Sequence, residues 1–322
     1  MLTTPAIRVL KLQGKGHVTV LTKAQYAPLF DGNPYVDRVL VLEGSLLALW
    51  PKLLTAGFTH VVDLHNNLRS HLVSWMLPWL PVYRTKKAGR ERRNLINKRT
   101  RQMPPKHVVD RHYKAISALD CVPDKFGLDY FIPAEAQIGF KTIPIMQFPF
   151  VAVVIGGQHN TKKLPEHKLV ELLRSIQEPV VILGAEAEKE LGQKAAGKLA
   201  IEGRWNIYNA CGELTLHQSA SVMQQAKEVY SHDTGLMHIA AALGKRVHTI
   251  WGSTVPAFGM YPYGTDFTVI EVKGLPCRPC HKHGFEACPL GHFKCMEEQD
   301  FTGQRKVYSS NQLSVRDELS HL

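Results

Sequence analysis

The chain has 322 residues, of which 44% are hydrophobic and 21% are charged, a balance that argues against a disordered protein and against a solenoid. Its length is sufficient for two domains of ordinary size. The net charge of +11 indicates anionic partners but does not choose among nucleic acid, acidic lipid and phosphorylated sugar. The apolar runs are far shorter than the roughly 20 residues that span a bilayer, and the first residues lack the apolar core of a signal peptide. We therefore expect a cytoplasmic protein.

Short apolar runs alternate with helix-like segments through the first domain, which we place at residues 1–145. The first helix is expected over residues 3–13, and the strands that follow at Val18–Leu21, Val39–Leu42, Val61–Leu64 and Pro81–Tyr83. This alternation is typical of a parallel sheet covered by helices. In a Rossmann-like domain a strand also precedes the first helix. The sequence shows no such strand before residue 3.

A polar cluster follows the third expected strand. His65, Asn66, Asn67 and Arg69 come directly after that strand, at the end of the sheet where doubly wound folds bind ligands. Asparagines also form turns, and an arginine on a helix is commonly solvated. Contact with a ligand and a purely structural role therefore both remain open for this cluster.

Basic residues gather between Arg84 and Arg101, where nine lysines and arginines face a single acid, Glu91. The run is either a solvated loop or a contact with anionic lipid, which attracts each basic residue near its surface by about 1 kcal/mol. No aromatic residues interleave with the charges in the way that nucleic-acid binding favours. We therefore expect peripheral contact with a membrane surface and no nucleic acid.

The second domain, expected over residues 146–322, opens with an apolar strand at Phe150–Ile155 that ends in two glycines. Gln158 and Lys162 lie in the loop after this strand, where a lysine can neutralise a diphosphate. Glu186 and Glu188 follow the next strand, Pro179–Leu183. An acid at such a strand end either binds the hydroxyl groups of a ligand or favours the N-terminus of a helix.

The segment Ser231–Ser253 reads as a strand, a turn, a helix and a second strand. Asp233 and Thr234 are good N-cap residues, and the unpaired amides of the first helical turn attract an anion. Gly235 allows a ligand to approach the backbone, and His238 lies one helical turn beyond Thr234 on the same face. The structural alternative is that Asp233 only caps the helix and His238 only packs.

Four of the six cysteines lie in the segment 277–296. They are Cys277, Cys280, Cys288 and Cys295. Their thiolates would suffice for a tetrahedral zinc site, but the spacing after the first pair is irregular for a zinc module. We favour a packed thiol cluster or a local redox pair over structural zinc. The remaining residues are expected to form C-terminal helices.

Several of these strings resemble one family. The string DTGLMHIAAALGK, followed by a strand and GST, resembles the donor-binding signature of glycosyltransferase family 9, the ADP-heptose:lipopolysaccharide heptosyltransferases. The strings VVDLHNNLRS and CPLGHFKCM also resemble the family. The resemblance implies an α/β fold of the GT-B type, with two Rossmann-like domains and a cleft between them. It implies inverting, metal-independent transfer of heptose from ADP-heptose to a lipid A or inner-core (Kdo-lipid A) acceptor of lipopolysaccharide.

The resemblance also assigns roles to residues of this chain. Lys162, rather than Lys163, would stabilise the departing diphosphate, and Leu214 would line the adenine pocket. The implied donor-binding set is Gln158, Lys162, Glu186, Glu188, Leu214, Asp233, Thr234, Gly235 and His238. The implied acceptor-binding set is His65, Asn66, Asn67 and Arg69.

The first residues fit the family only in part. LTTPAIRVLK matches the part of the family pattern that follows a strand and a Gly-Asp pair. That aspartate is the family's proposed general base, and by this register it would lie upstream of Met1. The two interpretations are a start that has been placed late, which we favour, and a catalytically inactive relic that binds a sugar nucleotide or a lipid.

Overall fold

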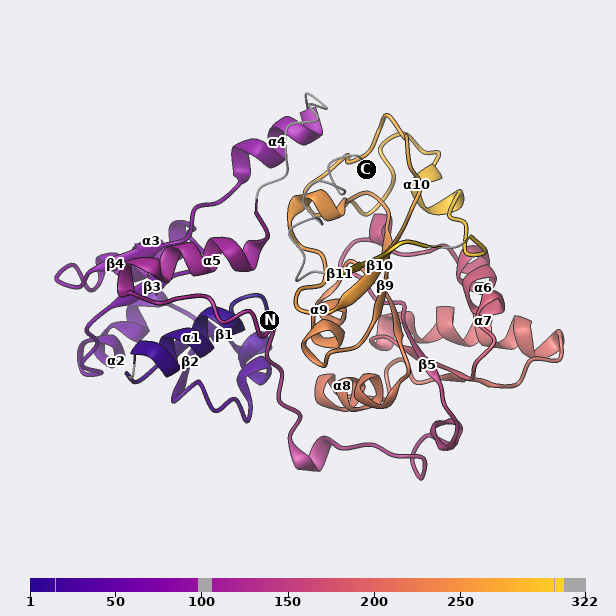
Figure 1. Cartoon of the computed structure of the whole chain (residues 1–322), viewed down its shortest axis with the longest axis horizontal. Coiled ribbons are helices and arrows are strands. Elements are labelled where there is room, and N and C mark those ends of the chain that lie inside the picture. Colours follow the sequence, from indigo (N-terminus) through magenta and orange to yellow (C-terminus); the bar gives the residue numbers. More distant parts are fainter. Residues whose placement is uncertain (15, 98–105, 304, 310–322) are drawn as a thin grey trace. The chain divides into compact units, whose positions relative to one another are not determined.

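The computed structural model describes residues 1–14, 16–97, 106–303 and 305–309 (Figure 1). The chain divides into two compact units. The first comprises residues 1–89 and 106–131, and the second comprises 90–105 and 132–322. The predicted boundary after residue 145 therefore falls inside the second unit. The reason is local packing, because the Ile138 amide donates to Ser221 Oγ at 2.9 Å and Gln225 Nε2 donates to the Ile138 carbonyl oxygen at 2.6 Å.

The first unit holds two parallel strand pairs at the predicted places. The pairs are β1 (Thr19–Lys23) with β2 (Arg38–Leu42), and β3 (Val61–Asp63) with β4 (Val82–Arg84). Its helices are α1 (Thr4–Gly14), α2 (Trp50–Leu54), α3 (Leu68–Trp75) and α5 (Val108–Ile116). A shared apolar cluster joins the two pairs, because Leu21 of β1 and Val61 of β3 both pack against buried Leu40, Leu49 and Leu53.

The second unit is built on a seven-stranded sheet. Its order is β11-β10-β9-β8-β5-β6-β7, parallel except for β11. The strands are β5 (Val151–Val154), β6 (Val180–Leu183), β7 (Ile207–Asn209), β8 (Val229–His232), β9 (Val247–Trp251), β10 (Asp266–Glu271) and β11 (Val307–Ser309). Counted from β5, the parallel strands follow the doubly wound order 3-2-1-4-5-6, so the order reverses between β5 and β8. Every residue of β5 and β6 is buried, as their continuous apolar sequences predict.

Two helix pairs cover this sheet, with α6 packed against α7 and α8 against α9. Figure 1 shows the sheet between the two pairs. The helices are α6 (Glu166–Ser175), α7 (Lys189–Ile201), α8 (Leu216–Gln225), α9 (Gly235–Ala242) and the single turn α10 (Lys294–Glu297). The remaining helix, α4 (Gly89–Asn97), begins at the last residue before the second unit.

The expectation of helices at the C-terminal end is wrong for residues 307–309. These residues form β11, which pairs antiparallel with β10. Tyr308 stacks on Phe267 of β10 with ring centroids 5.5 Å apart, so an aromatic pair across the strands fixes the segment to the sheet edge. Residues 310–322 lie outside the described part of the chain. Among the described residues, no helix has the length and apolar character that a membrane crossing requires.

Candidate functional site

The predicted donor residues of the second unit lie where the strand order of its sheet reverses. Strands β5 and β8 are hydrogen-bonded neighbours, and their loops leave the same edge of the sheet. The loop after β5 carries Lys162 in a short 3-10 helix, Asn160–Lys162, and β8 leads through Asp233 into α9. Ligands of doubly wound sheets bind at such a reversal.

Lys162 and Asp233 are brought together by this topology. Lys162 Nζ lies 2.5 Å from Asp233 Oδ2 and 3.3 Å from the Asp233 carbonyl oxygen. The Thr254 hydroxyl, from the loop after β9, donates to the same carboxylate oxygen at 2.9 Å. The two charged side chains are 15% and 13% exposed, so the pair is largely shielded from water. Two of the three ammonium protons are engaged, which leaves one for a ligand.

The N-terminus of α9 is free of a side-chain cap. Thr234 is the N-cap residue with extended backbone, but its side chain makes no capping hydrogen bond, and its hydroxyl lies 3.5 Å from Ser231 Oγ. The Asp233 carboxylate points to Lys162 and Thr254 instead. Thr234 therefore occupies the N-cap position that the sequence indicates, but neither its side chain nor that of Asp233 makes a capping hydrogen bond. The first-turn amides of this eight-residue helix keep their capacity to bind an anion.

Two buried histidines lie close to this helix terminus. His238 is 8% exposed, and no described group forms a hydrogen bond with its Nδ1 atom. Burial lowers the pKa of His238 to about 3, so the ring is neutral at pH 7. His232, at the end of β8, accepts the Leu164 amide at Nε2 over 3.1 Å, and burial lowers its pKa to about 4. His232 thereby fixes the end of the loop that carries Lys162.

A second set of contacts, which the sequence did not indicate, holds the loop that carries Lys162 against the loop after β9 and the cysteine-rich segment. Thr161 Oγ1 lies 3.0 Å from Ser253 Oγ and accepts the Phe285 amide at 2.7 Å. Arg278 donates to the carbonyl oxygens of Gly252 and Thr254 at 2.6 and 2.9 Å. The cysteine-rich segment therefore holds the loop that presents Thr254 to Asp233. The GST string was visible in the sequence, but nothing in its spacing indicated which partners it has.

The other predicted donor residues fall into different environments. Glu188 is nearly buried, accepts the Ala185 amide at 3.1 Å and lies 3.3 Å from Lys163 Nζ, so it has the structural role left open for it. The Glu186 side chain is 74% exposed. Gln158 is exposed, and Leu214, half-buried, lies between β7 and α8. Ligand contacts by Glu186, Gln158 and Leu214 therefore remain predictions.

In the first unit, the two asparagines of the polar cluster build the local structure. Asn67 caps α3 with a reciprocal capping box with Ser70, and Asn66 adopts a left-handed conformation at φ 49° while donating to the Thr85 carbonyl oxygen. Both therefore have the turn-forming role left open for them. His65 and Arg69 are exposed.

Positive charge surrounds His65. Although the side chain is exposed, the surrounding protein removes part of the hydration of its ring, which lowers the pKa of His65; the nearby charges of Lys87, Arg69 and Lys23 act in the same direction, while Asp63 opposes them. These cations come from the ends of β1, β4 and the start of α3, at one edge of the strand pairs. The arrangement suits an anionic group.

The described residues of the basic run from Arg84 to Arg101 are divided between the two units. Arg84 lies 3.5 Å from Asp63 and donates to Ser74 Oγ, so it stays within the first unit. Arg92, of the second unit, donates to the Phe258 carbonyl oxygen at 2.8 Å and is within range of the charge on Asp233. Lys86, Lys87, Arg90 and Arg93 are exposed. Lys98, Arg99 and Arg101 lie outside the described residues.

None of the four cysteines of the cysteine-rich segment, all of which are described residues, forms a disulfide bond. Cys295 is buried, which raises its pKa to about 12, and the other three are half-buried. In the described ranges, no group of three or more histidine, cysteine or acidic side chains is arranged to hold a metal ion.

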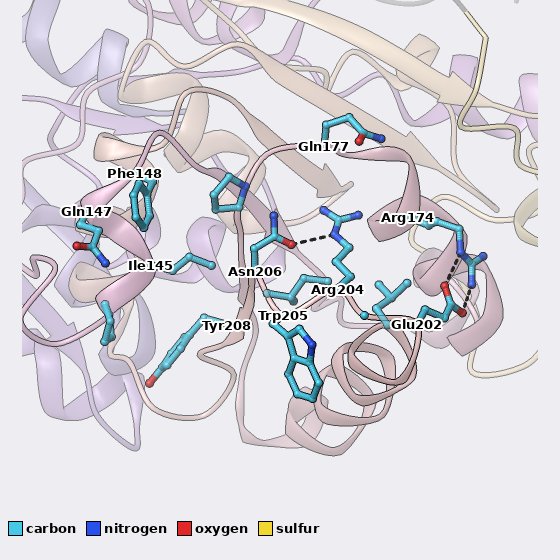
Figure 2. A pocket seen from close by; sticks show the side chains of 15 residues that line it. Ile145, Gln147, Phe148, Arg174, Gln177, Glu202, Arg204, Trp205, Asn206 and Tyr208 are labelled. Atoms are coloured by element: carbon cyan, nitrogen blue, oxygen red, sulfur yellow. Dashed lines mark hydrogen bonds and ion pairs between the residues drawn. The ribbon is translucent and has the colours of Figure 1, made fainter.

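A cavity of about 980 Å³ in the second unit lies away from these residues (Figure 2). Its lining includes Phe148, Pro179 and Asn206, which lie just before the first residues of β5, β6 and β7, respectively. The cavity therefore opens at the strand ends opposite to Lys162 and Asp233. Figure 2 shows Trp205 and Tyr208 along its rim.

Comparison with known proteins supports one family. The family model described as "Glycosyltransferase family 9 (heptosyltransferase)" matches residues 46–289, about three quarters of the chain. Lipooligosaccharide heptosyltransferase 2 of Haemophilus influenzae is 23% identical over 251 residues, which cover 72% of each chain. Lipopolysaccharide heptosyltransferase 2 of Escherichia coli is 29% identical over 114 residues, 34% of this chain and only 33% of that protein.

Solved structures agree on the fold. Escherichia coli ADP-heptose lipopolysaccharide heptosyltransferase II superposes with a TM-score of 0.62 at 21% identity, covering 92% of this chain and 93% of that one. A family 9 glycosyltransferase from Veillonella parvula gives 0.65 at 18% identity, covering 83% and 81%. The fold class is the GT-B type that the resemblance implies. The chain belongs to glycosyltransferase family 9, the heptosyltransferases.

Proposed function

We propose that this chain transfers a heptose from ADP-heptose to a phosphorylated lipid A or inner-core acceptor of lipopolysaccharide. The acceptor hydroxyl oxygen attacks the anomeric carbon from the face opposite the leaving group, which inverts the configuration. The bond to the diphosphate breaks, its electron pair leaves with ADP, and the acceptor proton passes to a general base.

The observation that carries this proposal is the group formed by Lys162, Asp233 and Thr254 beside the uncapped N-terminus of α9. A departing diphosphate gains negative charge at the transition state, and preorganised donors at that point lower the barrier. Asp233 and Thr254 hold the lysine in place before the ligand arrives. The unpaired Nδ1 of neutral His238 offers one further polar contact at the same terminus.

The acceptor, on this proposal, binds at the cationic edge of the first unit. His65 and Arg69 are exposed there, with Lys23 and Lys87 adding positive charge. Phosphate and carboxylate groups of an inner core match that charge. The acceptor is a membrane lipid, so we propose a cytoplasmic protein that works at the inner membrane surface.

We further propose that the transfer needs no metal. Lys162 and the amides of α9 supply the positive charge that a divalent cation supplies to diphosphates in other enzymes. The two sources of charge lie on the same side of the sheet, where the donor diphosphate would sit.

The test is a titration with ADP by calorimetry, followed by a transfer assay with ADP-heptose and Kdo-lipid A that detects the mass of one added heptose. Saturable ADP binding and the added mass support the proposal. Saturable binding with no transfer would refute transfer by this chain and support the alternative, a sugar-nucleotide-binding relic of the family. Failure of ADP to bind would refute the donor site itself.

A further inference from the structure

Helix α3 of the first unit presents apolar side chains outward. Leu68, Leu72 and Trp75 recur at the spacing of one helical face and are 74%, 38% and 64% exposed. Trp79, which follows the helix, is 61% exposed. We call these four residues the α3 face. Trp75 has a ring contact with His71 at 6.5 Å between centroids and otherwise keeps most of its surface in water.

The inward side of the same helix is mixed, because Val73 packs against the apolar cluster of the first unit while two serines make polar contacts. Ser70 Oγ donates to Asp63 Oδ2 at 2.8 Å, and buried Ser74 Oγ donates to the His71 carbonyl oxygen and accepts from Arg84. In an ordinary surface helix the apolar residues face the core and the polar residues face water. The α3 face departs from this pattern because its four apolar side chains are exposed, which indicates that an apolar surface covers it in the working protein.

Positive charge lies at the N-terminal end of the α3 face. Arg69 is next to Leu68 and is exposed. Lys86 and Lys87 follow β4 and are exposed, and the contact between Asn66 Nδ2 and the Thr85 carbonyl oxygen brings their segment to the start of α3. Lys87 and Arg69 both act on the pKa of His65, so these charges share one region.

We propose that the α3 face and its cationic end dock on a bilayer that contains anionic lipid. Tryptophan concentrates at membrane interfaces, and an apolar stripe flanked by lysine and arginine is typical of helices that lie in the interface. Four such side chains expose roughly 500 Å², below the ~800 Å² per partner of a typical protein interface. The α3 face is therefore better matched to lipid than to a second copy of the chain.

This inference deepens the proposed function, because the cationic end of the α3 face adjoins the proposed acceptor site at His65. A chain docked in this way would meet the headgroup of a membrane-bound acceptor at that edge. The docking itself requires no donor, so it can be tested independently of the reaction.

The experiment is sedimentation of the full chain with vesicles of phosphatidylethanolamine and phosphatidylglycerol, compared with vesicles of phosphatidylcholine alone. The double variant Trp75→Ala/Trp79→Ala should bind the anionic vesicles more weakly, by about tenfold for each tryptophan withdrawn from the lipid. Lys86→Ala/Lys87→Ala should weaken binding by about fivefold for each lysine at low salt and reduce the dependence on salt. The matched control is Trp205→Ala, because Trp205 is 79% exposed but belongs to the second unit.

Circular dichroism checks that each variant is folded, and an ADP titration of each checks the donor site. Unchanged vesicle binding by the double tryptophan variant would overturn the proposal. The proposal would also be overturned if the parent chain were a dimer in solution, and if the double tryptophan variant were a monomer with unaltered vesicle binding. That result would assign the α3 face to a second copy of the chain. Loss of ADP binding in the parent chain, with vesicle binding intact, would refute the donor site and leave the docking surface standing.

Discussion

Replacement of Lys162 by methionine separates the role of its charge from that of its bulk. The side chain keeps its apolar stem and most of its length, but the carboxylate of Asp233 loses the ammonium that lies 2.5 Å away. The charged hydrogen bond from Lys162 to a bound diphosphate is also lost. A hydrogen bond to a charged group contributes about 1.5–3 kcal/mol, which corresponds to a roughly 10- to 150-fold loss of affinity.

A second effect acts in the same direction. In Lys162→Met the carboxylate of Asp233 keeps the hydrogen bond from the Thr254 hydroxyl but loses its ammonium partner, so it repels the incoming diphosphate. We therefore expect the loss of ADP affinity to lie toward the upper end of that range, with a still larger loss of turnover, because charge on the leaving group grows at the transition state.

The assay is calorimetric titration with ADP, and the matched control is Lys163→Met. Lys163 pairs with Glu188 at 3.3 Å, whereas Asp233 pairs with Lys162, so the loss of Lys163 should change ADP affinity by less than about threefold, well below the cost of a charged hydrogen bond. Equal losses in the two variants would mean that general positive charge, not the placement of Lys162, attracts the ligand. An unchanged affinity in Lys162→Met would remove this lysine from the site.

Four further predictions follow from the same contacts. Asp233→Ala should weaken ADP binding in calorimetry, because Lys162 loses the carboxylate that anchors it and keeps only the backbone carbonyl oxygen of residue 233; equal affinity would show that the carboxylate anchor is dispensable. Arg278→Met should lower the free energy of unfolding by about 3–5 kcal/mol in urea, because it leaves Glu271, 2% exposed and 2.5 Å from Arg278, without its ion-pair partner. His232 has a pKa of about 4 when folded and about 6.5 when unfolded, so the unfolded chain binds more protons, and the contribution of His232 to stability should fall on the order of 2 kcal/mol between pH 7 and pH 5, a part of the slope that His232→Gln should remove in thermal melts. Transfer activity should persist in EDTA, and its loss with recovery on adding a divalent cation would contradict the metal-independent reaction.

The sheet of the second unit was largely predictable because its central strands are continuous apolar runs. Val151–Val154 and Val180–Leu183 are buried on both sides, so their sequences carry the signal directly. The strand Val307–Ser309 carried no such signal, since three residues become a strand only through pairing with β10. The domain boundary was placed too late because residues 132–145 have no clear period and are held by side-chain contacts with α8.

The site was predictable as a set of residues but not as a set of contacts. Lys162 and Asp233 are 71 positions apart, and their pairing arises from the adjacency of β5 and β8. The sequence therefore placed Asp233 as a cap of its own helix, because local hydrogen bonding is the only partner that spacing reveals. Thr254 lies in the loop after β9, and Arg278 lies in the cysteine-rich segment. The sequence pattern does not specify the course of either segment, so the contacts of these two residues with the site could not be predicted.

The most direct test of the central claim is a crystal structure of this chain with bound ADP-heptose. The account predicts that the diphosphate lies against Lys162 Nζ and the first-turn amides of α9, with the Asp233 carboxylate still held by Thr254. A diphosphate found instead in the cavity beside Trp205, at the opposite strand ends, would contradict it.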